Sequence, residues 1–131
     1  LDRIDIFTET IILKYGEISN SDKGENSYNV RKRIEKVHHI QKERYKNDGI
    51  LFNSELSAGM IKRYCVMDNE AKEYLENIFE NMEFSARAYH KVLKTARTIA
   101  DMDESGEIKR KHISEAVCYR TADKKYWGVT M

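Results

Sequence analysis

The chain has 131 residues, and its 23 basic residues nearly balance 22 acidic ones, which leaves a net charge of only +1. This length corresponds to one domain. A net charge so close to zero excludes a protein that attracts nucleic acid through its overall charge, so any surface that binds nucleic acid must be local. The two cysteines lack metal-ligand spacing and no apolar run is long enough to cross a membrane, so we expect a cytoplasmic protein with reduced thiols, no metal site and no membrane contact.

The first predicted element is a β-strand over 5–13. Its residues are mostly β-branched or aromatic, and the run is dense enough in apolar side chains for a buried strand. Residues 15–27 follow, with Gly16, Gly24 and mainly polar neighbours, a composition typical of a linker.

The rest of the chain predicts a bundle of about five helices. It contains no proline, and 34% of the residues are charged, which favours helices over strands. The apolar spacing places these helices after Ser27, over Ser54–Cys65, Asn69–Met82 and Phe84–Asp101, and from about Lys109 onward. The predicted fold class is therefore all-α, with one N-terminal strand.

The helix after Ser27 is strongly basic on the side that faces away from its apolar stripe. The predicted inner stripe consists of Val30, Ile34, Val37, Gln41 and Tyr45. Arg31 and Arg33 lie among the basic residues outside that stripe. We interpret this basic surface either as a solvated face or as a contact for nucleic acid or another subunit.

The segment Phe84–Asp101 predicts a helix with one apolar and one cationic side. The apolar side gathers Ala88, Tyr89, Val92, Leu93, Ala96, Ile99 and Ala100. The predicted cationic side consists of Arg87, Lys91, Lys94 and Arg97. Ser85 is a favourable N-cap, so Arg87 falls in the first turn, where a cation opposes the helix dipole. An arginine beside the unpaired N–H groups of that turn indicates a phosphate-binding corner, and a solvated cationic face is the alternative.

No complete catalytic site is evident in the chain. There is no GxxxxGK[ST] loop for a triphosphate and no strand that ends in paired acids for magnesium. The four histidines show no paired ligand spacing, and no Ser/His/Asp order is present. We therefore expect the chain to be catalytically inactive alone and to contribute residues to a site completed elsewhere.

Several motifs together resemble the C-terminal segment of the magnesium-chelatase-related AAA+ ATPases of the ComM or YifB type. The run SARAYHKVLKTARTIAD at 85–101 is followed by Ile108, His112, Ser114-Glu115-Ala116 and Tyr119-Arg120 at the spacing of that family. Upstream, Gly24-Glu25-Asn26-Ser27, Val30-Arg31-Lys32-Arg33-Ile34, Gln41 and Arg44 resemble a second conserved stretch. Leu1-Asp2-Arg3-Ile4-Asp5 resembles the LDR(I/F)D segment that closes the ATPase core.

The resemblance implies a role for two arginines. Arg3 matches the arginine finger, which reaches the γ-phosphate bound by a neighbouring subunit. Arg87 matches the sensor-2 arginine of the helical lid, which contacts the nucleotide of its own subunit or of a neighbour. The complete protein that the resemblance implies is a cytoplasmic homo-hexameric ATPase that uses ATP and magnesium and remodels DNA. Its ATPase core would lie in the same chain.

The resemblance also implies a division of the chain. Residues 1–14 would be the end of the ATPase core, 15–27 a linker and 28–131 the lid domain, and a start inside a family motif indicates an excised fragment. Two alternatives stay open: a free-standing helical module that binds nucleic acid through the cations of the two basic helices, and the lid of a true magnesium chelatase subunit in tetrapyrrole synthesis.

Overall fold

The computed structural model describes residues 5–8 and 24–126, and the side chains as far as Arg120. The regular elements of this part are five α-helices and one 3-10 turn, in the order α2 (Ser27–Arg44), η1 (Asn53–Glu55), α3 (Ala58–Tyr64), α4 (Asn69–Met82), α5 (Ala86–Met102) and α6 (Arg110–Tyr126). The predicted all-α class with about five helices is confirmed for the described residues.

Four helices begin at a polar residue whose side chain caps the first turn. In each case a side-chain oxygen accepts a hydrogen bond from the main-chain N–H three residues later, and the caps are Asn26, Ser57, Asp68 and Ser85. The predicted bounds of α4 and the predicted cap of α5 are confirmed. The prediction of one helix over Ser54–Cys65 is wrong, because the extended backbone of Leu56 separates η1 from α3, which begins only after its own cap.

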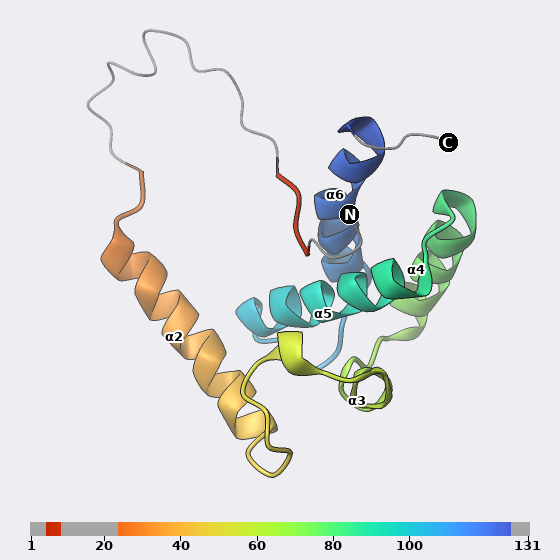
Figure 1. The fold of residues 1–131 in the computed structure, drawn as a ribbon. Coiled ribbons are helices and arrows are strands. Elements are labelled where there is room, and N and C mark those ends of the chain that lie inside the picture. Colours follow the sequence, from red (N-terminus) through yellow and green to blue (C-terminus); the bar gives the residue numbers. More distant parts are fainter. Residues whose placement is uncertain (1–4, 9–23, 127–131) are drawn as a thin grey trace, which may run out of the picture.

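Helix α5 forms the centre of the domain. It contacts α2, η1, α3 and α6, and α4 packs against α6. Figure 1 shows α5 across the middle, with α4 and α6 on one side and α2 on the other. The most deeply buried apolar residues include Ala71 and Leu75 of α4, Val92, Ala96 and Ala100 of α5, Ile113 of α6, and Ile108 in the loop before α6.

Helix α2 packs mainly through its C-terminal half. Val37, Gln41 and the following residue Tyr45 are buried as predicted, but Ile34 is 45% exposed. The prediction that the inner stripe is buried along the whole helix is therefore wrong. Figure 1 shows the cause: the N-terminal half of α2 extends away from the other helices, so no neighbouring helix covers its apolar side.

The predicted N-terminal strand is not present in the described residues. Residues 5–8 have no regular secondary structure, and 9–13 lie outside the described part of the chain. A strand needs a neighbour to accept and donate its main-chain hydrogen bonds. Here the N–H group of Phe7 instead donates to the carbonyl of Tyr119 in α6, over 2.8 Å. The segment thus docks against a helix.

Candidate functional site

Arg87 occupies the first turn of α5 and is exposed to solvent. Ser85 Oγ accepts the N–H of Ala88 at 3.1 Å, and the two preceding N–H groups of the helix have no acceptor within the helix. Arg87 makes no ion pair or hydrogen bond with any residue that the structure describes. Its guanidinium is therefore available to an anion beside the positive end of the helix dipole.

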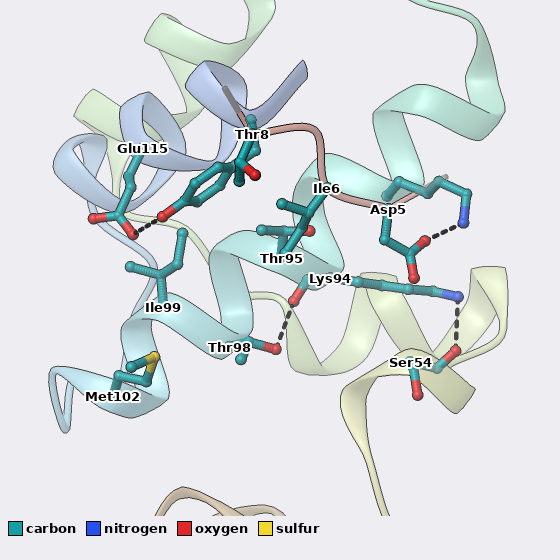
Figure 2. Close-up of a pocket in the computed structure, with 12 residues that line it drawn as sticks. Asp5, Ile6, Thr8, Ser54, Lys94, Thr95, Thr98, Ile99, Met102 and Glu115 are labelled. Carbon is teal, nitrogen blue, oxygen red and sulfur yellow. Dashed lines mark hydrogen bonds and ion pairs between the residues drawn. The ribbon is translucent and has the colours of Figure 1, made fainter. Parts of the chain in front are cut away.

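Lys91 and Lys94 continue the predicted cationic side, but each already has a partner. The ammonium of Lys91 pairs with the carboxylate of Asp5, and only 17% of the Lys91 side chain is exposed. Lys94 Nζ donates to the carbonyl of Ser54 over 3.1 Å. Figure 2 shows both contacts at the edge of a pocket of about 490 Å³ between α5, α6 and residues 5–8. These two lysines serve contacts within the domain.

Arg97 is buried, so the prediction of an exposed cation at this position is wrong. Its side chain is 2% exposed and forms an ion pair with Asp101 at 3.2 Å. The guanidinium also donates to the carbonyl of Gly106 at 3.0 Å and to that of Ser105 at 2.6 Å. Arg97 therefore holds the turn that follows α5 instead of facing a ligand.

Asp101 is the acceptor at the centre of a buried polar network. Its side chain is 1% exposed and receives two hydrogen bonds from the Arg44 guanidinium, one of them at 3.0 Å. Nδ2 of Asn53 donates to the same carboxylate at 3.0 Å. Burial lowers the pKa of Arg44, but its hydrogen bonds and charge interactions with Asp101 and Tyr45 together outweigh this effect, so the net shift is upward and the guanidinium stays charged.

Asn53 of η1 adds contacts to the same two helices, α2 and α5. Its side-chain oxygen accepts the hydroxyl of Tyr45 at 2.5 Å, and its amide donates to Thr98 Oγ1 at 2.9 Å. Its main-chain N–H donates to Gln41 Oε1 at 3.0 Å. Motif residues from α2 and from α5 therefore meet inside the domain, where they lock the two helices together.

Apart from Arg44, the basic residues of α2 are exposed, and two of these have acidic partners. Arg33 pairs with Glu25 at 2.5 Å, and Lys36 pairs with Glu104 at 2.9 Å. Arg31 is exposed and forms no ion pair with a described residue. The cationic surface of α2 is therefore smaller than its sequence suggests.

His112 has a structural position. Its side chain is 2% exposed, Nδ1 accepts the N–H of Lys109 at 2.9 Å, and Nε2 lies 3.0 Å from a carboxylate oxygen of Asp103. This arrangement assigns the proton to Nε2. Among the side chains that the structure describes, no group of histidine, cysteine, aspartate or glutamate could hold a metal ion.

The site predicted from sequence is thus divided among different environments. Arg87 is an open cation at the start of α5, whereas Lys91, Lys94 and Arg97 form contacts within the domain. Arg3, the predicted arginine finger, lies outside the described residues. Sequence reasoning missed the network around Asp101, although an arginine and an aspartate four residues apart, at positions 97 and 101, are a recognisable signal for a paired charge on one helix face.

Comparison with known proteins identifies the family. Residues 24–120 match the C-terminal domain of magnesium chelatase subunit ChlI, a span that covers the capped start of α2 and most of α6. The chain belongs to this family. The match includes Arg87 and the whole network around Asp101, so the features described above lie within the family domain.

Three relatives with assigned names align along nearly the whole chain. A protein named YifB from Salmonella typhimurium is 37% identical over 95% of this chain, and competence protein ComM from Haemophilus influenzae is 37% identical over 92%. YifB from Escherichia coli is 34% identical over 95%. The resemblance to the ComM and YifB type is confirmed by these matches.

The chain spans about a quarter of the length of these relatives, between 23% and 24%. No helix in the part of the chain that the structure describes is long and apolar enough to cross a membrane.

Proposed function

We propose that this domain is the helical lid of a ComM-like AAA+ ATPase and that Arg87 is its sensor-2 arginine, in contact with the phosphates of a bound nucleotide. The observation that carries the proposal is the exposed guanidinium of Arg87, without a partner among the described residues, at the start of α5. The apolar side of the same helix is buried in the domain core, so the arginine is held on a rigid support.

The chemistry of this corner suits a phosphate group. The N-terminal N–H groups of a helix and the positive end of its dipole both favour an anion. A guanidinium can add two parallel hydrogen bonds to phosphate oxygens. The cost of a cation in the first turn is then offset when the anion binds.

The proposal includes parts that lie elsewhere. An ATPase core in the same polypeptide would hold ATP and magnesium, and Arg3 would act as the arginine finger toward the nucleotide of a neighbouring subunit in a homo-hexamer. The chain described here supplies no nucleotide-binding loop. Its contribution is to place arginines around phosphates that the core binds.

The test is ATP turnover of the full-length protein with single substitutions. We expect Arg3→Ala to lower kcat by about 10³- to 10⁵-fold, the range found for arginine fingers. Arg87→Ala should also cripple turnover, and Arg87→Lys should restore only part of it because lysine lacks the planar fork. Arg110→Ala, an exposed arginine of α6 in an ion pair with Glu70, is the matched control. Near-normal turnover in both the Arg3 and Arg87 variants would refute the proposal.

We further propose that the complete machine acts on DNA. The support is the name of the competence protein relative and the exposed basic part of α2 around Arg31. The competing function is a free-standing module that binds nucleic acid, favoured by the same basic surface. The relatives of the ComM and YifB type favour the lid of a ComM-like ATPase over the lid of a true chelatase subunit.

Salt dependence separates the lid from the free-standing module. If the 131-residue chain is a binding module, it should bind a short DNA duplex at low salt, and affinity should fall steeply with salt concentration. Arg31→Ala should then weaken binding, while Lys62→Ala on α3 should not. Absence of binding at low salt would remove the module and leave DNA contact to the complete protein.

A further inference from the structure

Residues 5–8 are held to the helical domain at three points on two helices. Asp5 forms an ion pair with Lys91 of α5. The N–H of Phe7 donates to the carbonyl of Tyr119 in α6 over 2.8 Å. The guanidinium carbon of Arg120, also in α6, lies 5.2 Å from the centroid of the Phe7 ring. One charged, one main-chain and one cation–π contact thus fix a segment of four residues.

The side chains that receive this segment are themselves well supported. Arg120 is 3% exposed, so its guanidinium faces the Phe7 ring from within the domain instead of from solvent. A desolvated cation–π contact is stronger than one on the surface. Lys91 is mostly covered as well, and it lines the pocket next to residues 5–8.

The positions of these contacts along the chain are informative. Asp5 follows Arg3 by only two residues in the sequence. Lys91 follows Arg87 by one turn of α5, and side chains four residues apart in a helix are neighbours. The Asp5–Lys91 pair therefore joins the segment of one proposed phosphate ligand to the helix of the other.

From these contacts we infer that Lys91 and Arg120 are positioning residues, which clamp residues 5–8, the segment that follows Arg3 in the sequence, onto the helical domain that carries Arg87. The inference rests on the proposed function for the roles of the two arginines, but the clamp itself is a property of this chain. Lys91 then serves Asp5, and its ammonium is not a contact for nucleic acid. An anion could reach Lys91 only by displacing the Asp5 carboxylate.

The clamp is tested first in the 131-residue chain by NMR, without any measurement of activity. We expect slowed exchange of the Phe7 amide and a ring-current shift of the Arg120 guanidinium protons. Phe7→Leu should abolish the ring-current shift, and Asp5→Asn should accelerate amide exchange by roughly two- to fivefold, the factor that a contact of this strength supplies. Thr8→Ala, an exposed neighbour, is the control and should change neither signal. A Phe7 amide that exchanges at the rate of a free peptide would overturn the clamp.

The positioning role is tested in the full-length protein by ATP turnover and nucleotide affinity. Asp5→Asn and Phe7→Leu should each lower kcat and leave nucleotide Kd unchanged, with the double variant losing on the order of 10- to 100-fold, as expected for a misplaced catalytic group. Thr8→Ala should behave as wild type. If Arg3→Ala abolishes turnover but the double variant keeps normal kcat, the positioning role is refuted and the proposed function stands. If Arg3→Ala itself has no effect, the proposed function fails, while the NMR result still decides the clamp.

Discussion

Replacement of Asp101 by alanine should destabilise the domain more than removal of any exposed charge. The carboxylate is 1% exposed and neutralises Arg97, whose side chain is 2% exposed, as well as the Arg44 guanidinium. The alanine variant keeps both cations in place and leaves them without a counter-ion. Removal of one partner from a buried ion pair costs about 3–5 kcal/mol of unfolding free energy.

This loss is large compared with the stability of a domain of this size. Folded domains are stable by only about 5–15 kcal/mol. For a domain between 100 and 150 residues, a change of 1 kcal/mol shifts Tm by roughly 3–5 °C, so the expected drop is about 10–25 °C. Asp101→Asn should recover only a part of the lost stability, since the amide still accepts hydrogen bonds but carries no charge.

The measurement is thermal and urea unfolding of the 131-residue chain, followed by far-ultraviolet circular dichroism. The control is Lys36→Ala, which removes an ion pair with Glu104 whose two side chains are both more than half exposed. Such surface pairs contribute about 1 kcal/mol or less. A Tm for Asp101→Ala within about 3 °C of the Lys36→Ala control would refute the reasoning that this network holds the helices together.

Three further outcomes are expected. Burial raises the pKa of the Cys65 thiol to about 11, so a neutral alkylating reagent should modify the exposed Cys118 first, and equal labelling rates in peptide mapping would contradict this. A hydrogen bond from Lys111 lowers the pKa of Asp103 below its usual 3.8. The ionised carboxylate of Asp103 therefore stabilises the fold above about pH 4, and this stabilisation is lost as the pH falls through the folded-state pKa. The difference in urea stability between wild type and Asp103→Asn should shrink between about pH 5 and pH 3. Ser85→Ala removes the N-cap of α5 and should cost about 1 kcal/mol in urea unfolding, and an unchanged midpoint would contradict the capping role.

The helices could be predicted from sequence because their signals are local. Asn69–Met82 combines an aspartate cap with apolar residues at helical spacing, and its bounds agree with the structure. The apolar side of α5 was also predicted well, with Ala88, Val92 and Ala96 buried. The cap and the periodic apolar side both depend on residues within a few positions, so neither requires knowledge of the fold.

The errors arose where a distant partner decides the outcome. Arg97 lies only about 40° from Leu93 around the helix, close to the buried side, and its burial depends on Asp101 and on carbonyls of the next turn. Ile34 has the right spacing for a core position, but no other helix reaches it. Asn53 follows no helical pattern at all, yet it joins η1 to the two helices beside it. None of these contacts can be derived from spacing alone.

The attachment of α2 also has a mechanical consequence. The helix has 18 residues, and at about 1.5 Å per residue it is roughly 27 Å long. Its fixed point is at one end, where Arg44 meets Asp101, while the other end carries no buried residue. A tilt of about 10° around that fixed point would carry Ser27 through roughly 5 Å. Helix α2 therefore acts as a lever. A small rearrangement of the buried Arg44–Asp101 ion pair at its C-terminal end would produce a larger displacement of its N-terminal end and of the chain attached there.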